Sequence, residues 1–294
     1  MNTIEINHLT KDYGHHHGIF DLSFSVKEGE VLGFLGANGA GKTTTTRHLM
    51  GFIKPQKGSA KIMDLDCFRQ ASRVQDNIGY LPGEIAFMDQ MTGMDFIRFI
   101  AGMKHLTDLS RANELIQYLE LDPKVLIKKM SKGMKQKIGL VIAFMQDAPI
   151  LILDEPTSGL DPLMQNKFVE LINKEKEKGK TILMSSHIFE EVEHTCDRIV
   201  MIKEGELVAD EPMEKIRTGR SKHYEITFAS PADAAAFHAK HPNSELEGAS
   251  VTLLQKGKVN DLLQELSHYE IKDLDARHQT LEEVFLQYYG GKRS

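Results

Sequence analysis

Residues 36–43 constrain the fold of this chain more than any other segment. They read Gly-Ala-Asn-Gly-Ala-Gly-Lys-Thr, which matches the pattern G-x-x-x-x-G-K-[ST]. The apolar run Glu30–Leu35 before them is typical of a buried strand, and residues 43–52 after them look helical. In that order, backbone N–H groups surround phosphate oxygens and the helix aims its positive end at the same anion. The segment therefore predicts a phosphate-binding loop in an α/β fold.

A second apolar run ends in two carboxylates. Pro149–Leu153 predicts a buried strand, and Asp154 and Glu155 follow it directly. Because ligands of parallel sheets lie at the carboxyl ends of the strands, we expect both acids near the phosphate loop. Asp154 is expected to hold Mg²⁺ through water, and Glu155 to polarise the water that attacks a γ-phosphate. Lys42 is expected to reach the β- and γ-phosphates, and the Thr43 hydroxyl to take one Mg²⁺ position.

Two further segments carry weaker signals. His187 ends the predicted strand Thr181–Ser186, where an imidazole could contact a γ-phosphate and orient the attacking water. Ser131 opens a predicted helix, and its hydroxyl with the free N–H groups there could form an anion site. Taken alone, a histidine is more often structural, and a serine at such a position more often only caps a surface helix.

The order of predicted elements indicates two domains. Helices are predicted at Met94–Met103, at Arg111–Leu121 and from Ser131, and strands alternate with helices from Pro149 onward. This order implies a mostly parallel sheet with helices on both faces. The strand pattern restarts near residue 217, so we predict one domain over 1–216, with a helical subdomain at about 84–145, and a small α+β domain over 217–294. Thr280 and Glu283 predict a capping box for the last helix.

Composition narrows the function classes. The 294 residues carry a formal net charge of −6, which disfavours general nucleic-acid binding. No apolar stretch reaches the roughly 20 residues of a membrane-spanning helix, and the N-terminus lacks a signal-peptide core. Cys67 and Cys196 form no CxxC pair and fit buried thiols in a reducing cytosol. His15–His17 predict a solvated loop, because three adjacent imidazoles cannot all face one ion.

Residues 3–215, taken together, resemble an ATP-binding cassette (ABC) ATPase. The phosphate loop, the helix after Ser131, the acidic strand and His187 occur in the family's order and spacing, and the run DEPTSGLD at Asp154–Asp161 is the most specific part. The resemblance implies the ABC-type P-loop NTPase fold: a mixed sheet with helices, an antiparallel β subdomain and a helical subdomain. Its implied ligands are ATP and Mg²⁺.

The resemblance also implies the residues that contact ATP. Tyr13 would stack on adenine, and Ser131 and Gly133 would contact the γ-phosphate of the nucleotide held by a second subunit. Asp161 would lie in the loop that communicates across this dimer, which ATP closes and hydrolysis reopens. The implied nucleotide-contacting set is Tyr13, Gly36, Asn38, Gly39, Ala40, Gly41, Lys42, Thr43, Thr44, Ser131, Gly133 and Asp161.

The chain departs from the commonest family pattern at two places. The signature segment is Met130–Met134. In it, Lys132 stands in place of glycine and Met134 in place of glutamine. The family usually has glutamine where this chain has Gly83, which has no side chain to reach Mg²⁺. Glu84 is the candidate substitute at that metal position.

The chain further resembles the exporter branch in which a short cytosolic ATPase pairs with a separate membrane permease. The tail at residues 280–286 resembles the end of an accessory domain found in drug and antibiotic exporters of that branch. We therefore expect an ATPase subunit, held at the inner face of the cell membrane by its permease and paired with a second ATPase subunit as a homodimer or a heterodimer. Phe87, Met88 and Met91 are predicted to help line the groove for a permease helix, because methionine suits adaptable surfaces; the alternative is that these methionines fill gaps in the core.

Two other functions fit the same motifs less well. A non-transport ABC ATPase that works on chromosomes, repair substrates or ribosomes would usually carry long coiled coils or two cassettes, and neither is present here. A catalytically quiet regulatory subunit would explain the changes at Gly83 and Lys132. Four intact residues argue against it: Lys42, Asp154, Glu155 and His187.

Overall fold

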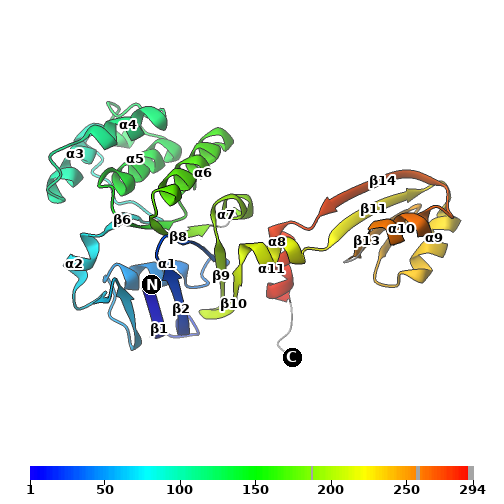
Figure 1. Cartoon of the computed structure of the whole chain (residues 1–294). Helices are drawn as coiled ribbons and strands as arrows, with labels where there is room; N and C mark the ends of the chain where they lie inside the picture. Colours follow the sequence, from blue (N-terminus) through cyan, green and yellow to red (C-terminus); the bar gives the residue numbers. More distant parts are fainter. Residues whose placement is uncertain (187, 256–258, 291–294) are drawn as a thin grey trace. The chain divides into compact units, whose positions relative to one another are not determined.

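The computed structural model describes residues 1–186, 188–255 and 259–290, with side chains as far as Leu286. The chain divides into two compact units, Met1–Met213 and Glu214–Ser294 (Figure 1). Within the described residues, no helix has both the length and the apolar character needed to cross a bilayer.

A six-stranded sheet forms the centre of the first unit, in the order β10-β9-β3-β8-β7-β6. Every pair of neighbours is parallel except β9 and β10, which form an antiparallel hairpin at one edge. Leu35 at the end of β3 pairs with Ser186 of β8, and Ser185 of β8 pairs with Asp154 at the end of β7. The carboxyl ends of these strands therefore meet at one edge of the sheet. The strands are β3 (Val31–Leu35), β6 (Ile78–Leu81), β7 (Ile150–Asp154), β8 (Thr181–Ser186), β9 (Arg198–Lys203) and β10 (Glu206–Pro212).

A second, antiparallel sheet packs in the same unit, in the order β2-β1-β4-β5. Its apolar face shares one core with the main sheet, in which Ile6, Leu22 and Phe34 are buried. The alternation between residues 3 and 30 predicts the first two strands, whereas the sequence patterns did not predict the two that follow. The strands are β1 (Asn2–Asp12), β2 (Gly18–Lys27), β4 (Lys57–Ile62) and β5 (Leu65–Asp66).

The helices of this unit lie around the sheets, with α3, α4 and α5 gathered on one side (Figure 1). Thr92 caps α3 by accepting from the Asp95 amide. The helix predicted at Arg111–Leu121 begins one residue earlier, at Ser110, and ends at Tyr118. The helices are α1 (Lys42–Leu49), α2 (Ala71–Gln75), α3 (Gly93–Met103), α4 (Ser110–Tyr118), η1 (Ile127–Lys129), α5 (Lys132–Met145), α6 (Pro162–Glu177) and α7 (Phe189–Thr195); α8 (Met213–Gly219) follows and, except for Met213, belongs to the second unit.

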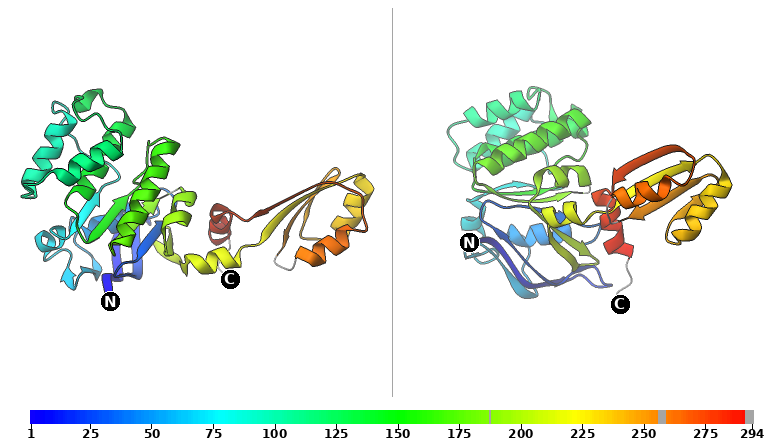
Figure 2. Two further views of the ribbon diagram at one scale, coloured as in Figure 1. Left: turned by 45° about the horizontal axis from the view of Figure 1, so that its top comes forward. Right: turned by 45° about the vertical axis from the view of Figure 1, so that its right-hand side comes forward.

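The second unit is an antiparallel sheet, in the order β12-β13-β11-β14, with α9 and α10 over one face (Figure 2). Phe228 and Phe237 pack in its core with ring centroids 5.3 Å apart. The predicted capping box is confirmed, because Thr280 and Glu283 each accept from the other's backbone amide. The elements are β11 (Lys222–Phe228), α9 (Pro231–Lys240), β12 (Glu245–Glu247), β13 (Ser250–Gln255), α10 (Val259–Leu266), β14 (Ile271–His278) and α11 (Leu281–Gly290).

Candidate active site

The predicted phosphate loop joins β3 to α1. Gly41 precedes the helix with φ of 113°, a conformation that favours glycine, and a Cβ there would lie 2.7 Å from Ile19 Cγ2. No side chain caps the first turn of α1, so its N–H groups are available to an anion. The loop curls back over Lys42, whose buried ammonium donates to the Gly36 carbonyl at 2.7 Å. The loop's own carbonyl group therefore holds the Lys42 ammonium in place.

Asp154 is fully buried at the end of β7, and both of its carboxylate oxygens accept hydrogen bonds. The Thr43 hydroxyl donates to Oδ2 at 2.9 Å, and the Ser185 hydroxyl donates to Oδ1. These oxygens at the edge of the phosphate loop are the hard donors that Mg²⁺ prefers, so Thr43 and Asp154 fit the predicted metal. A Cβ on Gly83 would lie 3.2 Å from Asp154 Oδ2, and Glu84, next along the chain, is exposed.

Glu155 adopts a left-handed backbone conformation, with φ of 51°. This conformation is uncommon for residues other than glycine and tends to occur at functional sites. The Glu155 amide is held by Ser185, whose carbonyl and hydroxyl oxygens lie 3.2 and 3.1 Å away. Its Oε1 lies 3.4 Å from the Lys42 ammonium. The backbone turn after β7 thus places the carboxylate of Glu155 beside the phosphate loop.

A cavity of about 270 Å³ brings together residues from distant parts of the sequence. Tyr13, which is 54% exposed, lines it together with Lys42 and Glu155. The predicted residues Gly36 and Ala40 lie in the same loop outside this lining. The lining consists of Tyr13, His17, Gly18, Ala37, Asn38, Gly39, Gly41, Lys42, Thr43, Thr44 and Glu155.

The signature residues do not line this cavity. Ser131 is exposed at the N-terminus of α5, where its Oγ accepts from the Met134 amide at 3.2 Å, as the capping prediction required. Gly133 follows in the first turn. Asp161 caps α6, since its Oδ1 accepts from the Met164 amide at 3.0 Å. The remaining predicted catalytic residue, His187, lies outside the described residues.

Known proteins resemble both the whole chain and its cassette. Residues 19–158 match the family model described as ABC transporter. The bacitracin transport ATP-binding protein BcrA of Bacillus licheniformis is 32% identical over 303 residues, covering 99% of each chain. This chain belongs to the ABC transporter ATP-binding proteins.

Solved structures support the same fold for this ABC ATPase. A structure of the ATP-binding subunit of an ABC transporter is 30% identical, has a TM-score of 0.67, and is matched over 74% of this chain and 92% of that chain. The dimeric structure of MJ0796, a bacterial ABC transporter cassette, is 22% identical with a TM-score of 0.65, over 71% and 98% of the two chains. The predicted ABC cassette fold is confirmed, and so is the prediction that the chain is the ATP-binding, ATP-hydrolysing subunit of a transporter.

Three further side chains around the site of the ABC ATPase were not predicted from the sequence. Ser185 holds both Asp154 and Glu155, and its place on the strand next to β7 was the available signal. His17 lines the cavity, although the sequence predicts only a solvated loop for the exposed turn that contains it. Gln136 is buried and donates to the Pro156 carbonyl at 2.8 Å, one helical turn beyond Lys132.

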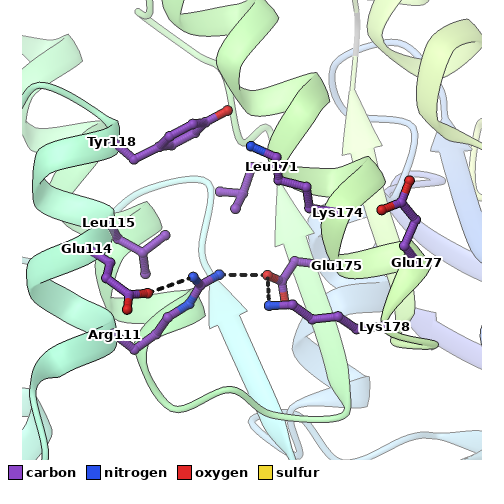
Figure 3. A pocket seen from close by; sticks show the side chains of 9 residues that line it. All are labelled: Arg111, Glu114, Leu115, Tyr118, Leu171, Lys174, Glu175, Glu177 and Lys178. Carbon is purple, nitrogen blue, oxygen red and sulfur yellow. Dashed lines mark hydrogen bonds and ion pairs between the residues drawn. The ribbon is translucent and has the colours of Figure 1, made fainter.

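A larger cavity, of about 480 Å³, lies between α4 and α6 of the ABC ATPase and contains none of the predicted site residues. Arg111 on α4 donates to Glu114 and, at 2.7 Å, to Glu175 on α6, which also accepts from Lys178 (Figure 3). Burial by itself raises the pKa of the fully buried Glu175, but hydrogen bonds from Lys178 and Lys180 outweigh it and leave the pKa below its usual value. These ion pairs connect α4 to α6.

Proposed function

We propose that this ABC ATPase energises a separate membrane permease, as an exporter, by closing on a second ATPase subunit when ATP binds and reopening after hydrolysis. The observation that carries the proposal is that the cavity gathers Tyr13, Lys42 and Glu155 but not Ser131 or Gly133. The signature segment therefore faces elsewhere and is available to a nucleotide on another subunit. The dimeric structure of MJ0796 supports the proposed pairing of two ATPase subunits. The name of BcrA, a bacitracin transport ATP-binding protein, supports the proposed role in transport.

Within each subunit, we assign binding and catalysis to different groups. Tyr13 offers its exposed ring to adenine, and Lys42 with the amides of the phosphate loop neutralises the phosphate oxygens. Glu155 accepts the proton of the attacking water, because its carboxylate is fixed beside Lys42. His187 would orient that water.

Thr43 and Asp154 would hold Mg²⁺ together with phosphate oxygens and water. When bound, Mg²⁺ neutralises charge on the β- and γ-phosphates. With glycine at position 83, the backbone next to Asp154 supplies no side-chain ligand, so Glu84 is the proposed further ligand, through water.

The proposed permease contact uses the surface around residues 87–91. Met88 is 44% exposed, and Met91 and Phe87 are half-buried. Phe87 packs on Phe96 of α3, with centroids 5.2 Å apart, so this surface rests on the helical side of the unit. Residues 217–294 are proposed as an accessory domain, and the permease would hold the ATPase at the inner face of the membrane.

The test is ATP-driven dimerisation of a Glu155→Gln variant. This variant should bind ATP with near wild-type affinity, hydrolyse it at least about 100-fold more slowly, and run as a dimer with ATP and as a monomer without it. Multi-angle light scattering after size-exclusion chromatography measures the mass. Adding Ser131→Arg should abolish the dimer and leave ATP binding to the single subunit unchanged, because the signature segment lies outside the cavity of its own subunit.

Three results would count against the proposal. ATP turnover at the wild-type rate in the Glu155→Gln variant would show that Glu155 is not the base. If the Glu155→Gln variant stays a monomer in saturating ATP and Mg²⁺, the proposed dimer cycle is wrong. Absence of turnover in the unmodified chain would favour a regulatory subunit.

A further inference from the structure

Lys132 reaches from the signature segment to the loop that follows β7. Its ammonium donates to the Ser158 hydroxyl at 2.8 Å. The side-chain stem packs against Gly159. A Cβ added at Gly159 would lie 2.9 Å from both Cγ and Cδ of Lys132. One side chain therefore makes a polar and an apolar contact with consecutive residues of the same loop.

Two neighbours on α5 hold the same loop at other points. Gln136, four residues after Lys132 and hence on the same helix face, donates to the Glu155 carbonyl at 3.2 Å and the Pro156 carbonyl at 2.8 Å. Gly133 permits the close approach, since a Cβ there would lie 2.7 Å from the Gly159 carbonyl oxygen. The helix face thus follows the loop from its start at Glu155 to Gly159.

The loop needs such support at its tip. Its internal backbone bonds run from Ser158 to Glu155 and from Leu160 to Thr157, at 3.2 and 3.0 Å. Gly159 is exposed, with φ of 81°, and a glycine loses more conformational entropy on ordering than any other residue. The stem of Lys132 packs against one side of this residue.

Helix stability does not account for a lysine at this position. Lys132 is the first residue of α5, where a positive charge is unfavourable next to the positive end of the helix. The contact with Ser158 and Gly159 gives the side chain a role that glycine at position 132 could not fill.

We propose that Lys132 is a positioning residue for ATP hydrolysis. It fixes the Thr157–Asp161 loop to α5, so that the signature segment and this loop meet the second subunit as one rigid element. The effect on hydrolysis rests on the proposed dimer cycle, whereas the fixing of the loop is a property of the single subunit.

The first experiment measures hydrogen exchange of the amides of residues 157–161 in the nucleotide-free full chain. Lys132→Met keeps the stem and removes the donor, and Ser158→Ala removes the acceptor. Each should speed exchange about 3- to 10-fold, the effect of losing one hydrogen bond of this class. Lys132→Arg should behave as wild type, and Lys132→Met with Ser158→Ala should exchange no faster than either alone. Lys128→Met, which removes a lysine bonded at 3.3 Å to Gln90 instead, is the control.

The second experiment separates positioning from binding. In Lys132→Met, kcat for ATP should fall about 3- to 10-fold while KM stays within about twofold, because Lys132 does not line the cavity. Lys132→Arg should restore kcat. Wild-type exchange in Lys132→Met, additive effects in the double variant, no rescue by arginine or an unchanged kcat would each overturn the proposal. Failure of the dimer cycle itself would appear as a monomeric Glu155→Gln protein and would leave the exchange result intact.

Discussion

The Thr43 hydroxyl lies 2.9 Å from Oδ2 of Asp154 and donates a hydrogen bond to it, although the two residues are 111 positions apart in the chain. The bond joins the first turn of α1 to the end of β7, and Ser185 engages the other oxygen of the same carboxylate. Asp154 is fully buried, so these donors replace the water that a carboxylate would otherwise bind. The nucleotide site thus includes a polar contact that also supports the fold.

Thr43→Val should destabilise the nucleotide-free protein by about 1–3 kcal/mol, because it leaves a buried carboxylate oxygen without its hydroxyl donor. Thr43→Ser keeps the hydroxyl and should lose far less. Urea unfolding followed by circular dichroism measures the difference. Equal stabilities of the valine and serine variants would show that the bond contributes nothing.

Tyr13→Ala should weaken ATP binding about 10-fold, because stacking of a base on an aromatic ring contributes about 1–3 kcal/mol. Tyr13→Phe keeps the ring and should bind almost as wild type. GTP, which also has a base to stack, should lose affinity in parallel. Titration calorimetry measures each affinity, and a phenylalanine variant as weak as alanine would assign the role to the hydroxyl instead.

Arg111→Met should lower the free energy of unfolding by about 1–3 kcal/mol at neutral pH, since Glu175 would keep its lysines and lose its guanidinium. Because the folded pKa of Glu175 is lowered, its ionic stabilisation is complete above the unfolded pKa of about 4.5 and is lost as pH falls through the folded value. The gap between wild type and variant should therefore be full at pH 7 and shrink below about pH 4.5. A gap that is constant with pH would contradict this origin.

Met88→Asp with Met91→Asp should abolish association with the permease and leave ATP binding intact, because the added charges would be desolvated in an apolar contact. Met103→Asp is the matched control, since Met103 is 65% exposed at the end of α3, outside the proposed contact. Co-purification of the ATPase with its permease is the measurement. Normal co-purification of the double variant would remove residues 87–91 from the contact.

Local patterns predicted the parts of the site that are contiguous in sequence. The phosphate loop and the acidic strand end carry their signal within eight residues or fewer, and each follows an apolar run long enough to indicate a buried strand. Ser185 was missed because its contact with Asp154 arises from the register between β7 and β8, which residue spacing does not reveal. His17 was not predicted because the turn of residues 13–17 brings it beside Tyr13, and the sequence pattern of this loop does not reveal the shape of that turn.

Element ends were predicted less well than element positions. The strand β14 runs to His278 although residues on both of its faces are exposed and polar and apolar residues do not alternate, so its end is not visible in the sequence pattern. The helix α4 ends at Tyr118, with Leu119 as its C-cap, before any glycine or proline. Backbone geometry, rather than a stop residue, ends that helix.

At position 155, stability and activity favour different residues, because the backbone of Glu155 is left-handed. Glycine adopts this conformation without strain, so Glu155→Gly would relieve it and remove the hydrolytic base in the same step. Random variants enriched only for heat resistance would therefore be expected to accumulate inactive proteins altered at residue 155. A stability screen on this enzyme needs a parallel selection for turnover.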